Sequence, residues 1–281
     1  MIGLQVAVSS LIRNCSDPAK LTLWFLCADH SATDKKLIEE LLQFEKYSGG
    51  YHLIDFSPVD TFGQFASLHG DWTCYGRLLL ADYVDADQVL YLDSDLVVET
   101  DILALSSFDF QNRCLAAVPG CEFRYTLGHK FYIDQLHISP ELEYFNDGVM
   151  LLNLRLWREQ QIKSKCLEIA RKYPMELPSH DQSILNIICR GDFARLPAEY
   201  NCEWRANDDR PTTADRMILH FVGSPKPWDP FASYIHRGAE IWGAYRRRNR
   251  DLGQYQLSPA ALKRAWHIRR SYVRYLRDKF A

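Results

Sequence analysis

Short apolar runs alternate with amphipathic stretches along most of the chain, and few folds accommodate such an order. The apolar runs have the length of buried strands and occupy residues 21–27, 51–56, 89–92, 114–118, 149–153 and 217–221. Segments whose apolar side chains have helical spacing lie between them, at residues 2–11, 31–44, 75–83, 157–173 and 181–189. This order predicts an α/β fold, with an open sheet flanked by helices.

Charge is distributed unevenly along the 281 residues. Residues 246–281 contain eleven Lys and Arg against two Asp, a net charge of +9; the whole chain carries −3, so the remainder carries −12. An acidic body argues against nucleic-acid binding. Because a proline-rich turn at residues 225–230 precedes this change, we expect one domain over residues 1–235 and a basic, aromatic, helical tail over residues 236–281.

The cysteines and the apolar stretches indicate the cellular compartment. None of the eight cysteines forms a C-x-x-C pair, which argues against a zinc ribbon, and several lie in apolar runs as reduced core thiols would. No stretch reaches the roughly 18–20 apolar residues that span a bilayer, and the first residues lack a basic leader. We therefore expect a cytoplasmic protein.

Two aspartates follow directly on the apolar run at residues 89–92. In extended backbone Asp93 and Asp95, separated by Ser94, point to the same side, where their charges repel. A divalent cation would remove that conflict by taking the carboxylate oxygens as ligands. A solvated surface turn is the alternative, but the apolar residues on both sides favour burial, and burying unpaired acids is unfavourable.

His220 lies in a second apolar run, ahead of a turn that contains Gly223 and Lys226. A lone histidine in such a place is usually a hydrogen-bonded core residue. A neutral imidazole combined with carboxylates would instead suit Mn²⁺ better than an all-oxygen Mg²⁺ site. Lys226 could then neutralise a phosphate group.

Two further polar clusters precede buried elements. Asn146, Asp147 and Gly148 form a turn ahead of the strand at residues 149–153, and Asp181 and Gln182 open the helix at residues 181–189. Each has an ordinary explanation, as a turn and as acid in the first turn of a helix. The functional interpretation places these side chains at the hydroxyl groups of a sugar.

Taken together and in this order, these segments resemble the family 8 retaining glycosyltransferases, which include bacterial lipopolysaccharide galactosyl- and glucosyltransferases. The resemblance covers roughly residues 1–230. It implies a single-domain GT-A type fold with a mixed, mostly parallel central sheet, a UDP-sugar donor and Mn²⁺, with Mg²⁺ as an alternative. It also implies that Asp93, Asp95 and His220 bind the metal.

The resemblance further assigns residues to the donor and to the reaction. The implied donor-binding residues are Arg77, Asp93, Ser94, Asp95, Asn146, Asp147, Gly148, Asp181, Gln182, Gly223 and Lys226. The catalytic candidates are Gln182, Asp181 and Asp147. Because an amide is a poor nucleophile, front-face attack by the acceptor is favoured over a covalent intermediate.

In this family a strand ending in an acidic, Asn-rich turn precedes the helix that resembles residues 2–11, and that turn holds the uracil and the ribose. Here the sequence begins at the helix. We therefore expect the first strand to be missing, with weakened donor binding and an incomplete sheet edge.

Three interpretations of residues 246–281 and three of the function stay open. The tail is either a solvated helix packed on the body, a nucleic-acid binder, or, as we favour, a segment that binds an anionic membrane surface. The protein is a hexosyltransferase acting on a glycan or glycolipid acceptor, a metal-dependent nucleotide-sugar hydrolase or nucleotidyltransferase, or a non-catalytic carbohydrate-binding or stress protein of the same fold.

Overall fold

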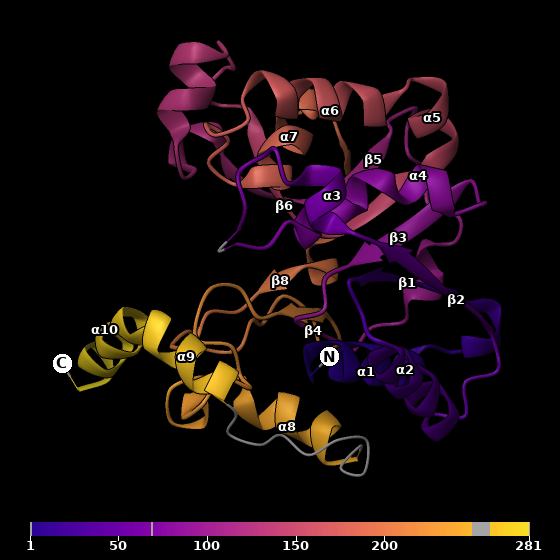
Figure 1. Ribbon diagram of the computed structural model, residues 1–281, viewed down its shortest axis with the longest axis vertical. Helices are drawn as coiled ribbons and strands as arrows, with labels where there is room; N and C mark the ends of the chain where they lie inside the picture. Colours follow the sequence, from indigo (N-terminus) through magenta and orange to yellow (C-terminus); the bar gives the residue numbers. More distant parts are fainter. Residues whose placement is uncertain (1, 69, 249–258, 281) are drawn as a thin grey trace.

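The structure, a computed structural model, describes residues 2–68, 70–248 and 259–280 (Figure 1). Its strands are β1 (Thr22–Ala28), β2 (Gly50–Phe56), β3 (Gln88–Leu92), β4 (Leu96–Val98), β5 (Leu115–Glu122), β6 (Glu143–Asn153), β7 (Ala194–Arg195), β8 (Cys202–Glu203) and β9 (Ile218–His220). Its α-helices are α1 (Ile2–Asn14), α2 (Ala32–Phe44), α3 (Pro58–Phe62), α4 (Leu80–Tyr83), α5 (Leu154–Glu159), α6 (Ile162–Lys172), α7 (His180–Cys189), α8 (Ala239–Arg248), α9 (Pro259–His267) and α10 (Arg269–Phe280). The predicted α/β architecture is confirmed.

The described strands form three sheets, ordered β1-β2, β3-β6-β5-β7 and β4-β9-β8. The sheets are mixed, as predicted, but parallel pairing does not predominate in the central one. There β6 runs antiparallel to both β3 and β5, and only β5 and β7 are parallel. The predicted mostly parallel central sheet is therefore wrong. The spacing of apolar residues gives no information on strand direction.

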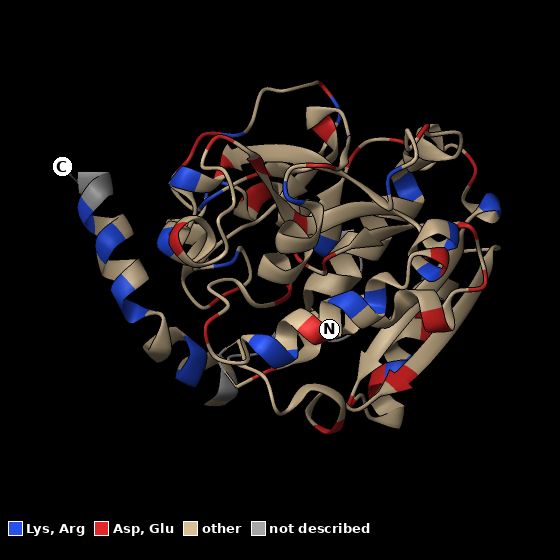
Figure 2. Ribbon diagram, turned by 90° about the horizontal axis from the view of Figure 1, so that it is seen from above, with Lys and Arg blue, Asp and Glu red and all other residues tan. Residues whose placement is uncertain are grey.

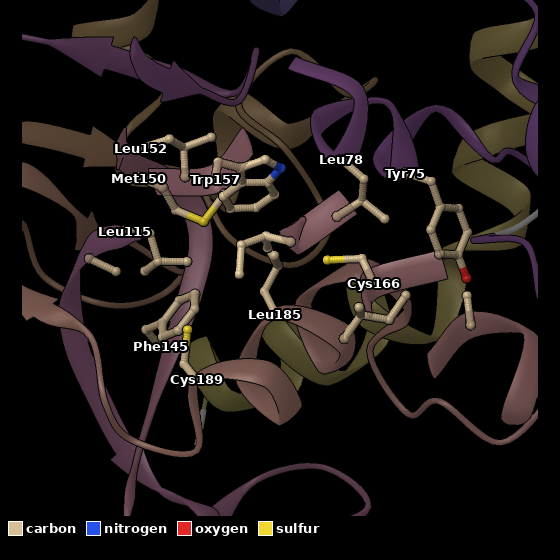
Figure 3. Close-up of a cluster of buried hydrophobic side chains, with 14 of the residues drawn as sticks. Tyr75, Leu78, Leu115, Phe145, Met150, Leu152, Trp157, Cys166, Leu185 and Cys189 are labelled. Atoms are coloured by element: carbon tan, nitrogen blue, oxygen red, sulfur yellow. The ribbon is translucent and has the colours of Figure 1, made fainter. Parts of the chain in front are cut away.

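Strand β6 is buried on both faces and separates two parts of the core. Met150 and Leu152 pack into one hydrophobic cluster with the helices α5–α7, whereas Val149 and Leu151 pack into another with α1. Successive strand residues point to opposite faces, so one apolar run serves both clusters. Figure 3 shows the first cluster, and Figure 1 shows α5–α7 on that side of the sheet.

Two predicted helices differ from what the sequence indicated. The expected helix at residues 157–173 is divided into α5 and α6, because Gln161 adopts a left-handed conformation with φ of 53°. The break lets Trp157 and Ile162 both enter the core. The expected helix at residues 75–83 begins as a 3₁₀ helix, Thr73–Leu79, and only its last turn is α4.

The basic tail is helical, as predicted, but its described residues form three helices, α8, α9 and α10, rather than one. Its residues 249–258 and 281 lie outside the described part of the chain. Between its helices and residues 231–235 runs an apolar groove of about 610 Å³. None of the described helices is long and apolar enough to cross a membrane. All eight cysteines are free.

We expect the cluster of Figure 3 to dominate stability. Leu185 of α7 is 1% exposed within it. Leu185→Ala should therefore lower the free energy of unfolding by about 2–5 kcal/mol, through lost burial and a residual cavity. Urea denaturation measures this change. Leu127→Ala is the matched control, since Leu127 is 75% exposed and its truncation should change stability by less than about 0.5 kcal/mol. Equal changes in the free energy of unfolding for the two substitutions would contradict the dominant role of this cluster in stability.

Candidate metal and donor site

The candidate site lies where β3, β4 and β9 approach one another. Asp93 follows β3 and Asp95 precedes β4, whose Leu96 lies opposite His220 in the antiparallel pair with β9. The potential ligand atoms of Asp93, Asp95 and His220 all lie within 4.8 Å of one another. The structure thus brings His220 next to two aspartates that are far from it in sequence, as an intact metal site requires.

An asparagine orients the ring of the buried His220. Its Nδ1 lies 2.9 Å from Oδ1 of Asn201, and Nδ2 of Asn201 donates in turn to Oδ1 of Asn146 at 3.1 Å. Because the Asn201 oxygen can only accept, His220 donates from Nδ1 and keeps a lone pair on Nε2. This tautomer is the one in which a histidine binds a metal through Nε2.

A carboxylate oxygen without a donor faces that lone pair. Oδ1 of Asp95 lies 3.3 Å from Nε2 of His220 and is buried, with no hydrogen-bond donor among the described residues. Two electron-rich atoms so close together repel unless a proton or a metal cation lies between them. Burial raises the pKa of Asp95, but the adjacent His220 and Lys226 outweigh burial and hold that pKa below its usual range. The carboxylate therefore stays charged and able to bind a cation.

Glycine is required at position 148 because the site closes tightly around it. A Cβ atom there would lie 2.3 Å from Cε1 of His220 and 2.9 Å from Oδ2 of Asp93. The carbonyl oxygen of Gly148 also accepts a hydrogen bond from the backbone of Asp93 at 2.8 Å. Residues 146–148 lie inside β6 and not in a turn ahead of a strand, as the sequence had predicted, so this strand forms part of the wall of the site.

Arg77 lies beneath the site and pairs with three carboxylates. Its guanidinium nitrogens lie 3.0 Å from Asp93, 2.9 Å from Asp147 and 2.8 Å from Asp181. The group also stacks 4.4 Å above the ring of Tyr91, whose hydroxyl donates to Oδ1 of Asp93 at 2.8 Å. Since Oδ1 of Asp93 already accepts two hydrogen bonds, its Oδ2 is the oxygen available to a metal.

Burial shifts the ionisation of this group of side chains. Burial lowers the pKa of Arg77, but the carboxylates of Asp147, Asp181 and Asp93 outweigh it and raise that pKa well above its ordinary value. Burial also raises the pKa of Asp147, and the neighbouring Asp181 adds to the rise while Arg77 opposes it. The pKa of Asp147 therefore lies well above its ordinary value, which favours the protonated carboxyl at this position.

Amide side chains connect β6 with α7. Oδ1 of Asn186 accepts a hydrogen bond from the backbone nitrogen of Phe145, and Nδ2 of Asn186 donates to the carbonyl oxygen of Phe145, both at 2.9 Å. This places Oε1 of Gln182 3.3 Å from Nδ2 of Asn146, while Nε2 of Gln182 donates to the hydroxyl of Tyr144 at 3.1 Å. The predicted sugar-contacting residues are therefore held in one continuous network.

The loop after β9 brings a lysine to the acidic pair. Gly223 has φ of 75°, a conformation that favours glycine, and a Cβ there would meet no atom within 4 Å. Nζ of Lys226 donates to Oδ2 of Asp95 at 2.6 Å and also to the carbonyl oxygen of Phe221. The loop thus places a positive charge directly beside Asp95.

Sequence reasoning missed two residues that support this site, Asn201 and Asn186. Neither of them stands in a motif: Asn201 precedes a two-residue strand, and Asn186 occurs inside a helix. Their partners are distant in sequence, so only the folded chain identifies them.

Comparison with known proteins agrees with the fold. The sequence model described as "Glycosyl transferase family 8" matches residues 1–232. The lipopolysaccharide 1,2-glucosyltransferase of Escherichia coli is 28% identical over 252 residues, 83% of this chain and 71% of that protein. The crystal structure of the galactosyltransferase LgtC with donor and acceptor sugar analogues is 26% identical, with a TM-score of 0.72, and the match covers 87% of this chain and 90% of that one.

This chain belongs to glycosyl transferase family 8, which confirms the resemblance seen in its sequence. The match to LgtC confirms the GT-A type fold. The probable glycosyl transferase Gly of Streptococcus gordonii is 30% identical over 197 residues, 69% of this chain but 26% of that protein. The chain spans less than half the length of Gly and of the pneumococcal relatives GlyE, GlyA and GlyF.

If Asn201 orients a metal ligand, its removal should weaken metal binding more than folding. We expect Asn201→Ala to reduce Mn²⁺ affinity, measured by titration calorimetry, by about 10–100-fold, as loss of a ligand's hydrogen-bond partner does. Asn153→Ala is the matched control, because Asn153 only caps α5 by accepting from Leu156 at 3.1 Å. A similar loss of Mn²⁺ affinity in both variants would contradict the role of Asn201.

Proposed function

We propose that the chain transfers a hexose, galactose or glucose, from a UDP-hexose to a glycan or glycolipid acceptor in cell-surface glycan synthesis, with retention of configuration. The observation that carries the proposal is the meeting of Asp93, Asp95 and His220 around a buried oxygen without a donor. Family membership and the names of the lipopolysaccharide glucosyl- and galactosyltransferases among its relatives support the hexosyl class.

The residues present fit a divalent cation. Oδ2 of Asp93, Oδ1 of Asp95 and Nε2 of His220 would hold it, and the mixture of oxygen and nitrogen favours Mn²⁺ over Mg²⁺. When bound, the cation would supply positive charge to the diphosphate of the donor.

The remaining side chains would bind and orient the donor. Lys226 would turn from Asp95 to the departing phosphate, whose negative charge grows as the sugar leaves. Ser94 lies between the two aspartates and Gly223 lies in the loop that carries Lys226. Both would contact the donor through their backbone groups. Arg77 is buried under three carboxylates, so we assign it to positioning Asp93, Asp147 and Asp181 rather than to direct contact with the sugar.

The geometry supports front-face attack over a covalent intermediate. Gln182 carries no charge, and Asp147 and Asp181 both form ion pairs with Arg77. In our proposal the acceptor hydroxyl oxygen bonds to the anomeric carbon as the bond from that carbon to the phosphate oxygen breaks. The hydroxyl proton passes to the released phosphate oxygen on the same face. Gln182 and Asn146 would stabilise the sugar while positive charge develops on it.

Release of UDP separates this proposal from its two rivals. With Mn²⁺ and either UDP-galactose or UDP-glucose, we expect release that rises strongly when a lipooligosaccharide acceptor is added. Release that does not depend on acceptor would indicate a hydrolase. Donor binding without release would indicate a carbohydrate-binding protein.

A matched pair of aspartates tests the metal site in the same assay. Asp95→Asn should reduce turnover by about 100-fold or more, since it removes a charged ligand from the site of charge development. Asp55→Asn should leave turnover unchanged, because Asp55 lies on β2, its side chain is exposed, and among the described residues it forms an ion pair only with Lys35 of α2. Full activity of Asp95→Asn would refute the metal-assisted mechanism.

We further propose that the tail binds an anionic membrane surface, which would place the protein on the inner face of the cytoplasmic membrane. Phe231, Tyr234 and Trp266 are 62%, 72% and 66% exposed beside the apolar groove. Figure 2 shows blue bands along α10, where the helix extends away from the body. Exposed Arg270 and Arg274 belong to it. Aromatic side chains beside cationic ones are typical of an interfacial segment.

Vesicle sedimentation tests the membrane proposal. We expect binding to vesicles with anionic lipid, little binding to neutral ones, and weakening by salt. Arg270→Glu combined with Arg274→Glu should weaken binding by about tenfold or more, since each cation near such a surface contributes about 1 kcal/mol. The control is Arg155→Glu, an exposed arginine of α5. Equal binding of both variants would refute the proposal.

A further inference from the structure

Helix α9 of the tail reaches the donor-site loop through one buried carboxylate. Nε of Arg264 lies 2.6 Å from Oδ1 of Asp229, and Nη2 lies 3.1 Å from Oδ2. The side chain of Asp229 is only 2% exposed. A buried carboxylate is unfavourable without a partner charge, and the paired contacts of Arg264 provide it.

Asp229 in turn fixes the backbone of Lys226. Oδ2 of Asp229 accepts from the backbone nitrogen of Lys226 at 2.7 Å, and the backbone nitrogen of Asp229 donates to the carbonyl oxygen of Lys226 at 3.0 Å. These two bonds close the turn at residues 226–229. The same lysine extends its side chain to Asp95. An unbroken series of contacts therefore runs from Arg264 through Asp229 to Lys226.

The loop has an anchor at each end. At its start, the backbone of Phe221 bonds the carbonyl oxygen of Asp95 at 3.0 Å. Around Gly223 there is open space. At its end, Tyr272 of α10 adds a second tail contact by donating to the carbonyl oxygen of Pro230 at 2.5 Å. The tail thus fixes the end of the loop that carries Lys226.

We propose that Arg264 is a positioning residue for the donor diphosphate, acting on Lys226 through Asp229, so that the tail completes the donor site. This inference rests on the proposed function and goes beyond it. The family model ends at residue 232, before α9, so membership in the family does not assign this role. The ligand class is a nucleoside diphosphate.

Calorimetric titration of UDP in the presence of Mn²⁺ tests the proposal on the full chain. Arg264→Met should weaken UDP binding by about 10-fold or more, the range seen when a ligand-positioning contact is removed. Arg264→Lys, which keeps the charge but not the paired geometry, should recover part of the affinity. Lys263→Met, at the exposed neighbouring position on α9, should bind UDP as the unaltered chain does.

A double substitution separates positioning from a purely structural role. Once Lys226→Met has removed the ammonium group, adding Arg264→Met should weaken UDP binding by less than about twofold more. Additive losses, or a lowered melting temperature with unchanged UDP affinity in Arg264→Met, would overturn the inference alone. Failure of the unaltered chain to bind UDP with Mn²⁺ would overturn the proposed function and this inference with it.

Discussion

The buried guanidinium of Arg77 is the interaction on which the rest of the site depends. It joins the end of β3, the middle of β6 and the start of α7 through Asp93, Asp147 and Asp181. Without it, three carboxylates would face one another in a region from which water is largely excluded. Removing one partner of such a buried pair typically destabilises by about 3–5 kcal/mol. The same contacts that hold these elements together therefore also hold the carboxylates in place.

The acidity of this region explains why a cation and a diphosphate would bind together. Arg77 and Lys226 supply two positive charges against Asp93, Asp95, Asp147 and Asp181, and the raised pKa of Asp147 reduces the negative excess without removing it. Net negative charge at a buried site attracts a divalent cation but repels a phosphate. The cation would reverse this balance locally, so that diphosphate affinity depends on the metal as well as on Lys226.

Parts of this arrangement were predictable from sequence because they are local. Asp93 and Asp95 share a face by the geometry of extended backbone, and the apolar residues around them indicated burial. The proximity of His220 followed only from the family resemblance, since no spacing rule connects residues so far apart. Strand direction was wrong for β6 because the same apolar run fits either orientation. Asn201 and Asn186 were missed because each acts on a backbone or ring that folding brings to it.

The fold also explains why the loop after β9 can serve both the metal and the leaving phosphate. His220, the last residue of β9, is fixed in the sheet by pairing with Leu96, so its backbone cannot move without disrupting β4 and β9. Lys226, six positions on, depends instead on a turn closed by Asp229, whose charge is balanced from outside the sheet. A metal ion requires ligands in a fixed geometry, which the rigid His220 would provide. A phosphate requires only a nearby positive charge, which the more movable Lys226 would provide. Attaching the loop to the tail at its adjustable end lets donor affinity respond to the tail without disturbing the metal ligands.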